Sequence, residues 1–244
     1  MQLTPEQVSS YAVNGYLVVD GLIAPGQIAA LKSRLDAMEE SALAARETAV
    51  TYQVEKGVAV AAKPSLRKFD EPARNDPAFL AVVSTPAILD VVTELTGGGP
   101  GIMMYSDQVF MKPAFCGSEK PLHQDNSYFK VTPNTAGITC WIALDDATLE
   151  NGCLHYIPGS HKLGLVKHRE LKDTPHLTPD VDFALPEQVA VPVPAGACIF
   201  HHLLAMHSSK TNASAFPRRA YAVHYANRSA EHSVRPWEQM IPLR

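Results

Sequence analysis

The stretch ACIFHHLLAMHSSKTNASAFPRRAYAVHYA, residues 197–226, contains two runs that are typical of buried β-strands. They cover residues 197–202 and 219–226, and a segment rich in Ser, Thr, Asn and Pro separates them. Similar runs occur earlier in the chain, at 102–111, 137–144, 153–157 and 189–193. Several short strands with turn residues between them predict a sandwich or barrel of the jelly-roll kind.

The first hundred residues have a largely helical pattern. Thr4 followed by proline is typical of a helix start. After Pro25, apolar residues recur at helical spacing through 28–38, and two short helices are expected near 77–83 and 86–96. We therefore expect a mainly β (α+β) chain in which N-terminal helices pack outside a jelly-roll core.

The domain organisation follows from these patterns. We expect one domain over residues 1–244, with a helical part at 1–99 and the jelly-roll core at 100–228. Segment 43–67 is alanine-rich and weakly periodic, and we expect a loop that borders a pocket. Segment 159–187 contains several prolines and is longer than most connections, so we expect a lid loop there.

Composition excludes several classes of function. Lys and Arg total 21 against 25 Asp and Glu, a net charge of −4, and the charges are scattered along the chain. This balance argues against nucleic acid or an acidic membrane surface as a partner. The four cysteines form no CxxC pair, and no long apolar run or secretion signal is present, so we expect a cytoplasmic protein with reduced thiols.

The motif His123-Gln124-Asp125 places an imidazole and a carboxylate two residues apart. On an extended segment, both side chains point to the same face and can bind one metal ion. A third ligand from a distant strand would complete a two-histidine, one-carboxylate triad of the kind that holds Fe(II). The spacing alone also arises by chance, and most of the ten histidines are expected to have structural roles.

The segment quoted above offers the missing partners. His201, His202 and His207 are all candidates for the third ligand on spacing alone. Arg218 and Arg219 stand at the start of the following strand-like run, where an arginine guanidinium could pair with a buried carboxylate group. The hydroxyl of Ser209 could donate to the same oxygens.

Taken together, these motifs resemble a known family. HQDNSYF (123–129), WIALDDATLENGCLHYIPGSHK (141–162), and HSSKTNASAFPRR (207–219) with the YAVHYA run behind it resemble the phytanoyl-CoA dioxygenase family of Fe(II)- and 2-oxoglutarate-dependent oxygenases. The opening LTPEQV and NGYLVVDGLI segments, within residues 3–23, look like the start of that family. The resemblance implies a double-stranded β-helix, a cupin-like variant of the jelly roll.

The resemblance also implies a site. His123, Asp125 and His207 would be the catalytic iron ligands. Arg218, eleven residues after His207 as in family members, would hold the far carboxylate of 2-oxoglutarate together with Ser209. This offset selects His207 over the two neighbouring histidines.

Four more residues are implied as neighbours of the cosubstrate: Trp141, Thr139, Tyr105 and Lys68. Trp141 occupies the family's tryptophan position, although an ordinary core aromatic is an equal alternative. Thr139 should face the same way by strand alternation. The alternative for Tyr105 is packing on the sheet, and for Lys68 an exposed position in solvent.

Other residues in these motifs receive structural interpretations. We expect His161 in a turn near the lid and Arg219 in a surface salt bridge. Gln124 is expected to face away between the two ligands. Tyr128 and Phe129 are expected to form walls of the pocket.

The function implied is hydroxylation of an unactivated C–H bond in a small or medium-sized metabolite. Fe(II), 2-oxoglutarate and O2 would be required, and succinate and CO2 released. Alternatives are desaturation, cyclisation or epimerisation in natural-product biosynthesis, or a cupin-like metalloprotein that does not use 2-oxoglutarate. Related halogenases have a small residue at the position of Asp125, so this carboxylate favours oxidation over halogenation. The expected partner is a small molecule, with no nucleic acid or membrane.

Overall fold

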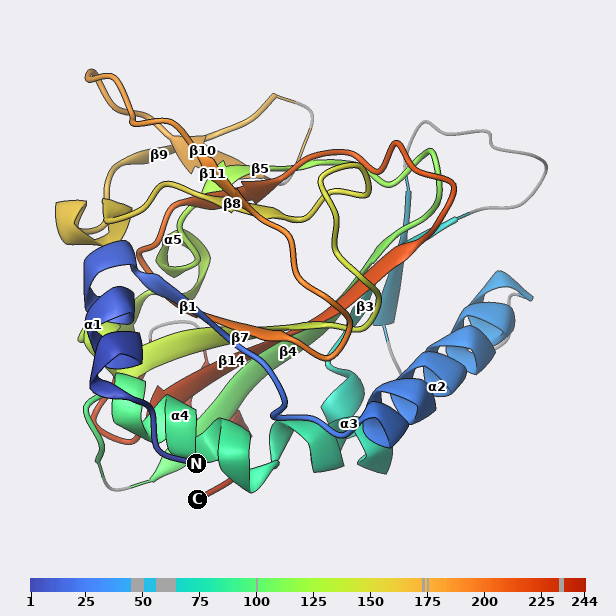
Figure 1. Cartoon of the computed structure of the whole chain (residues 1–244), viewed down its shortest axis with the longest axis horizontal. Helices are drawn as coiled ribbons and strands as arrows, with labels where there is room; N and C mark the ends of the chain where they lie inside the picture. Colours follow the sequence, from blue (N-terminus) through green and yellow to red (C-terminus); the bar gives the residue numbers. More distant parts are fainter. Residues whose placement is uncertain (45–50, 56–64, 100, 173, 175, 233–234) are drawn as a thin grey trace.

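The computed structural model describes residues 1–44, 51–55, 65–99, 101–172, 174, 176–232 and 235–244. Figure 1 shows two layers of strands that face each other, with helices along the outer side of one layer. This arrangement confirms the predicted mainly β architecture with N-terminal helices outside it.

The larger sheet has eight antiparallel strands. Their order is β1 (Tyr16–Val19), β12 (Cys198–His202), β7 (Gly137–Ala143), β14 (Arg218–Asn227), β4 (Ile102–Lys112), β3 (Leu66–Asp70) and β2 (Thr51–Val54), with β16 (Ile241–Pro242) beside β4. The smaller sheet follows the order β11 (Val189–Val191), β8 (Leu154–Tyr156), β13 (His207–Ser209) and β5 (Lys120–His123). Two short pairs complete the strands: β9 (His168–Glu170) with β10 (Leu177–Pro179), and β6 (Val131–Thr132) with β15 (Glu231–His232).

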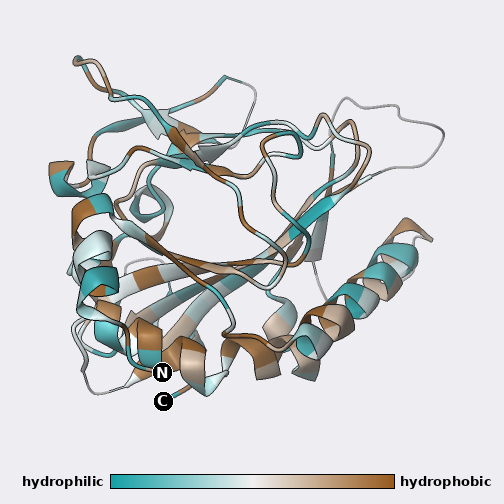
Figure 2. Ribbon diagram, in the orientation of Figure 1, coloured by the Kyte–Doolittle hydropathy of each residue, from teal (hydrophilic) through white to brown (hydrophobic). Residues whose placement is uncertain are grey.

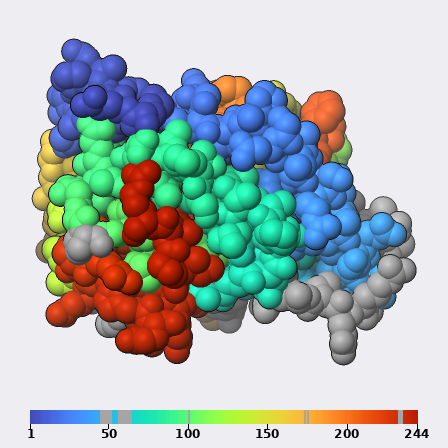
Figure 3. All heavy atoms as spheres, turned by 90° about the horizontal axis from the view of Figure 1, so that it is seen from below, coloured from blue at the N-terminus to red at the C-terminus, as the bar shows by residue number. Residues whose placement is uncertain are grey.

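The helices are α1 (Pro5–Asn14), α2 (Pro25–Leu43), α3 (Pro77–Val83), α4 (Pro86–Leu95) and the one-turn α5 (Asn126–Phe129). Figure 3 shows the N-terminal segments, together with the C-terminal segment in red, covering the outer face of the molecule. No single helix in the described ranges is long and apolar enough to span a bilayer; α3 and α4 meet that test only as a pair bent by 46°.

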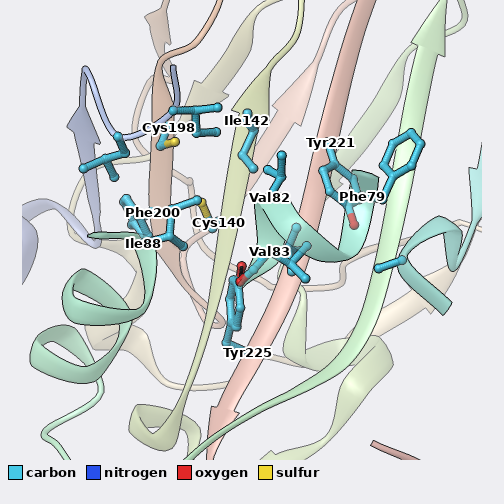
Figure 4. Close-up of a cluster of buried hydrophobic side chains, with 14 of the residues drawn as sticks. Phe79, Val82, Val83, Ile88, Cys140, Ile142, Cys198, Phe200, Tyr221 and Tyr225 are labelled. Atoms are coloured by element: carbon cyan, nitrogen blue, oxygen red, sulfur yellow. Dashed lines mark hydrogen bonds between the residues drawn. The ribbon is translucent and has the colours of Figure 1, made fainter. Parts of the chain in front are cut away.

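The main core lies between the helices and the outer face of the larger sheet. Figure 2 shows apolar residues, in brown, gathered where α3 and α4 meet the strands. Figure 4 shows Phe79 and Val83 of α3 packed against Tyr221 and Tyr225 of β14. The rings of Phe79 and Tyr221 meet edge to face at 5.2 Å, a geometry that stabilises by about 1 kcal/mol beyond burial.

The inner face of the same sheet carries smaller side chains at its centre. Along β14, Tyr221 and Val223 face the helices, whereas Ala220 and Ala222 face the smaller sheet. Because successive residues of a strand alternate between faces, Arg218 and His224 share the inner face with these alanines. The small alanines leave room between the sheets for a cavity.

Two segments differ from what the sequence predicts. The lid segment 159–187 is not a simple loop, because it contains a 3₁₀ turn, Ser160–Leu163, and the β9–β10 pair. Segment 43–67 contributes β2 and the start of β3, which extend the larger sheet, although it borders the cavity as expected, through Gln53, Glu55 and Arg67. The rest of the expected pocket-border loop, at 45–50 and 56–64, lies outside the described residues.

Candidate metal and cosubstrate site

Three buried side chains, His123, Asp125 and His207, converge on the cavity between the sheets. One ligand atom from each lies within 4.8 Å of the other two. Nε2 of His123 is 3.4 Å from Oδ1 of Asp125, and Nε2 of His207 is 3.7 Å from the same oxygen. Two imidazole nitrogens and a carboxylate oxygen form a donor set that suits a divalent transition metal such as Fe(II).

The smaller sheet positions the two histidines. His123 is the last residue of β5, and His207 is the first residue of β13. The two are directly paired across these strands, so their side chains lie next to each other. Asp125 does not lie on the strand as expected, since its backbone is helical (φ −57°, ψ −37°) at the start of α5. The turn into α5 brings its carboxylate back toward the histidines.

Backbone carbonyls determine which nitrogen of each histidine faces the site. Nδ1 of His123 lies 2.8 Å from the carbonyl oxygen of Pro121, and Nδ1 of His207 lies 3.0 Å from that of Ala205. A carbonyl only accepts hydrogen bonds, so both Nδ1 atoms carry the proton. The Nε2 lone pairs therefore face Asp125 and are available to a metal.

The second oxygen of Asp125 is held by two other side chains. The hydroxyl of Thr139 donates to Oδ2 at 2.6 Å, and Nε2 of His201 donates to the same atom at 3.0 Å. Since both bonds end on Oδ2, the carboxylate presents Oδ1 alone to His123 and His207. The arrangement fits a metal bound by one oxygen of the carboxylate.

A row of polar residues across three strands supports this carboxylate. Thr139 on β7 is paired with His201 on β12 and with His224 on β14. Because the hydroxyl of Thr139 donates its proton to Asp125, the oxygen of that hydroxyl accepts a hydrogen bond from Nδ1 of His224 at 3.0 Å. The hydroxyl of Tyr156 lies 2.8 Å from Nδ1 of His201, and must donate to it because Nε2 carries that ring's proton.

The protonation states of the three ligands follow from their surroundings. Burial opposes the charge of Asp125, but the nearby His207 and the hydrogen bond from His201 hold the pKa of its carboxyl well below the usual range. Burial, with His123 and His201 adding to it, holds the pKa of His207 well below that of a free imidazole. Burial and Lys120 also lower the pKa of His123. At neutral pH the site offers a carboxylate and two neutral imidazoles, the states that bind metal.

Arg218 is a buried cation, 2 % exposed, that lines the same cavity. Its Nε and Nη1 atoms have no hydrogen-bond partner among the described residues, and no carboxylate there forms an ion pair with it. Its guanidinium lies over the ring of Trp141, 5.5 Å from the ring centroid. Burial lowers the pKa of Arg218 to about 10, so it stays charged at neutral pH. A buried, unpaired cation of this kind calls for an anionic ligand.

The cavity has a volume of about 290 Å³ and is lined by residues from both sheets. Its lining contains all the predicted site residues except Tyr105: His123, Asp125, His207, Arg218, Ser209, Trp141, Thr139 and Lys68. Lys68 also forms an ion pair with Asp70 at 2.7 Å. Tyr105 packs against Phe129 and His224 at ring distances of 5.2 and 5.8 Å, so its predicted contact with the cosubstrate stays a prediction.

The structural interpretations of other motif residues are confirmed. Gln124 turns away from the metal site and bonds to Gly164, Val166 and Leu204. Arg219 points outward and pairs with Asp145 and Asp36. His161 lies in the 3₁₀ turn at the start of the lid segment.

Residues that the sequence did not single out for these roles are also present. The sequence predicts His201 only as an alternative metal ligand and not as a hydrogen-bond partner of Asp125. Side chains alternate between the two faces of β12, so His201 lies on the same inner face as Ile199, a signal that could have identified it. The cavity lining also contains Arg67, Lys120 and His176. No local pattern connects these three positions, because they come from β3, β5 and the segment before β10.

Comparisons with known proteins show to which family the chain belongs. The family model for phytanoyl-CoA dioxygenase (PhyH) matches residues 11–220. A probable phytanoyl-CoA dioxygenase of Caenorhabditis elegans is 28% identical over 92% of this chain and 76% of its own length. A phytanoyl-CoA dioxygenase domain-containing protein 1 of Bos taurus is 28% identical, over 91% of this chain and 89% of its own length.

Solved structures show the same fold. The non-heme monooxygenase ThoJ superposes with a TM-score of 0.77 at 24% identity, covering 98% of this chain and 83% of its own. The epimerase SnoN, solved in complex with Fe3+, alpha ketoglutarate and nogalamycin RO, has a TM-score of 0.75 at 20% identity and covers 98% of both chains. The family match spans most of the sequence, and on that basis the chain belongs to the phytanoyl-CoA dioxygenase family of oxidoreductases.

Proposed function

We propose that the protein is a non-haem Fe(II)- and 2-oxoglutarate-dependent oxygenase that hydroxylates an unactivated C–H bond of a small or medium-sized metabolite. The observation that carries this proposal is the buried guanidinium of Arg218, whose Nε and Nη1 atoms have no partner among the described residues, in the same cavity as His123, Asp125 and His207. A bound metal ion alone would not provide a partner for the buried guanidinium. A dicarboxylate could bind the metal at one end and pair with Arg218 at the other.

Each group of residues in the cavity would have a separate role. His123, Asp125 and His207 would hold the iron, with Thr139 and His201 fixing the orientation of the carboxylate. Arg218 and Ser209 would bind the far carboxylate of 2-oxoglutarate, and Trp141 would pack beside it. With iron, 2-oxoglutarate and O2 bound, the site would have the oxidising power to attack an unactivated C–H bond, with succinate and CO2 released. The protein's own contribution is to position the target carbon and to exclude water.

The size of the cavity supports a compact substrate. Its volume of about 290 Å³ is at the lower end of the range for ligand sites, about 300–1,000 Å³, and the cosubstrate takes part of it. A free small or medium-sized metabolite fits this space. A coenzyme A thioester would have to leave its nucleotide portion outside.

A second candidate is another oxidation at the same site. Solved structures of similar fold include SnoK, described as a non-heme alpha ketoglutarate dependent carbocyclase, and the epimerase SnoN. Asp125 favours all of these oxidations over halogenation, because the carboxylate fills the position that a chloride ion would need. A metalloprotein that does not use 2-oxoglutarate is disfavoured by Arg218.

The test is a screen of candidate metabolites for substrate-stimulated conversion of 2-oxoglutarate to succinate, with product masses measured in parallel. A gain of one oxygen supports hydroxylation, whereas a loss of two hydrogens supports desaturation or cyclisation. Succinate formation that persists in His207→Ala, or after iron is removed by a chelator, would refute the proposal.

A further inference from the structure

Three basic side chains meet at one edge of the cavity. Nη2 of Arg67, on β3, lies 2.7 Å from Nε2 of His176. Nζ of Lys120, on β5, lies 3.2 Å from Nδ1 of the same imidazole and 3.3 Å from the hydroxyl of Tyr128. All four residues line the cavity. In Figure 1, β3 belongs to the lower layer and β5 to the upper layer, so the cluster joins the two layers at the edge of the cavity.

The cluster has hydrogen-bond donors on Arg67, Lys120 and Tyr128 that are not matched by acceptors within the cluster. Arg67 only donates, so Nε2 of His176 accepts from it, and Nδ1 of the neutral ring carries the proton. The ammonium group of Lys120 also only donates, so its contact with Nδ1 is no hydrogen bond while the lysine is charged. The Tyr128 hydroxyl accepts from Lys120 and from the backbone N–H of Leu177, which leaves its own hydrogen free to donate.

The charges of this cluster are not balanced within the described part of the chain. No carboxylate there forms an ion pair with Arg67 or Lys120, whereas the neighbouring Lys68 is paired with Asp70. Burial, with Arg67 and Lys68 adding to it against the pull of Asp125, lowers the pKa of Lys120 to about 8. Burial and the charges of Lys120 and Arg67 lower the pKa of His176 to about 4. The cluster thus gathers half-buried positive charge that no carboxylate of the described ranges neutralises in an ion pair.

We propose that Arg67, Lys120 and Tyr128 bind an oxyanion of the primary substrate, a carboxylate or a phosphate group, at this edge of the cavity. The proposal rests on the function proposed above for the cavity. A group that only accepts hydrogen bonds satisfies all the free donors and supplies the missing negative charge. His176 positions Arg67 through its Nε2 atom. Arg218 lies on a different strand, β14, and serves the cosubstrate, so the cavity has two separate anion sites.

A purely structural role is the competing explanation, because the same contacts attach the segment before β10 to β3 and β5. A measurement of anion binding to the protein distinguishes the two explanations, because a purely structural cluster would not bind an added anion. The protein is loaded with Mn(II) and N-oxalylglycine, an unreactive analogue of 2-oxoglutarate, so that Arg218 is already occupied. Hexanoate, inorganic phosphate and the neutral hexanamide are then titrated in by calorimetry at neutral pH.

The variants are Lys120→Met, which removes the charge, Lys120→Arg, which keeps it, and the exposed Lys172→Met as a matched control. We expect saturable binding of hexanoate or phosphate, and none of hexanamide. In Lys120→Met the dissociation constant should rise about tenfold, the loss expected for one charge-assisted contact. Lys120→Arg and Lys172→Met should bind like the wild type. Preference for hexanoate assigns a carboxylate, and preference for phosphate assigns a phosphate group.

Three outcomes would overturn the proposal: no saturable binding of either anion to the wild type, equal binding of hexanoate and hexanamide, or unchanged anion affinity in Lys120→Met. A loss of 2-oxoglutarate affinity in Lys120→Met would also overturn it, because the cluster would then belong to the cosubstrate. Failure of the proposed function has a different signature. Wild-type protein would then not bind 2-oxoglutarate in the presence of Fe(II), whereas anion binding at Lys120 can still be measured without metal.

Discussion

Thr139 donates a hydrogen bond of 2.6 Å to Oδ2 of Asp125, the carboxylate oxygen that does not face the two ligand histidines. His201 donates to the same oxygen at 3.0 Å. Together these bonds orient the carboxylate before any metal binds. Such supporting partners commonly contribute about 10- to 100-fold to metal affinity.

Thr139→Val should therefore weaken metal binding by about tenfold or more, because the isosteric side chain removes only the hydroxyl. Mn(II) affinity measured by calorimetry checks this prediction. Thr139→Ser, which retains the hydroxyl, is the matched control and should bind almost normally. Equal affinities for Thr139→Val and wild type would show that Asp125 needs no such support.

Arg218→Gln should weaken 2-oxoglutarate binding by about 2 kcal/mol or more, roughly thirtyfold, while Fe(II) binding is retained. The reason is that the buried guanidinium is the expected partner of the far carboxylate. The neighbouring Arg219→Gln is the control, since Arg219 points outward to Asp145. The idea fails if both variants bind 2-oxoglutarate equally well.

Gln124→Ala should release the lid segment. The amide of Gln124 bonds to the carbonyls of Gly164 and Leu204 at 2.8 Å and accepts from the N–H of Val166 at 3.0 Å. Leaving such buried groups without partners costs about 1–3 kcal/mol each. Hydrogen–deuterium exchange should accelerate at residues 160–168. Gln188→Ala, which affects only an exposed bond to Ser208, should leave exchange there unchanged.

The metal-free protein should lose stability as the pH falls from about 6.5 toward 4. Burial, as the main cause, lowers the pKa values of His202, His224 and His176 to about 4 from an ordinary value of 6.5. Between these values the unfolded state binds more protons than the folded state, so acid favours unfolding. Asp107, whose pKa burial raises to about 6, and Glu39, whose pKa burial also raises, act in the opposite direction, but the histidines with lowered pKa values outnumber them.

The urea midpoint of the metal-free protein, measured near pH 7 and near pH 5, checks this balance. A lower midpoint near pH 5 is expected. A midpoint that stays constant or rises would mean that the buried histidines do not govern the acid stability.

Much of this site can be predicted from the sequence, because its motifs are local or have a fixed offset. The spacing of His123 and Asp125, together with the family resemblance and its offset from His207 to Arg218, identified residues that line one cavity. Alternation along a strand also identified Thr139. Asp125 nevertheless lies in a helical turn rather than on a strand, a detail that the two-residue spacing does not distinguish.

What the sequence did not reveal depends on contacts between distant segments. Arg67, Lys120 and His176 are brought together by the approach of β3, β5 and the segment before β10, and none of them belongs to a recognisable pattern. The pair β9 and β10 was missed because each strand has three residues, too few for a clear alternation, and Pro179 ends the second one. The cytoplasmic location stays a prediction.

The most direct test of the central claim is an anaerobic titration of the protein with Fe(II) and 2-oxoglutarate, followed by visible absorption. If His123, Asp125 and His207 hold the iron and Arg218 anchors the cosubstrate, a metal-to-ligand charge-transfer band should appear and saturate. The band should be absent in His207→Ala and present in His202→Ala, whose imidazole packs against His161 away from the site. No band in the wild type, or an unchanged band in His207→Ala, would contradict the account.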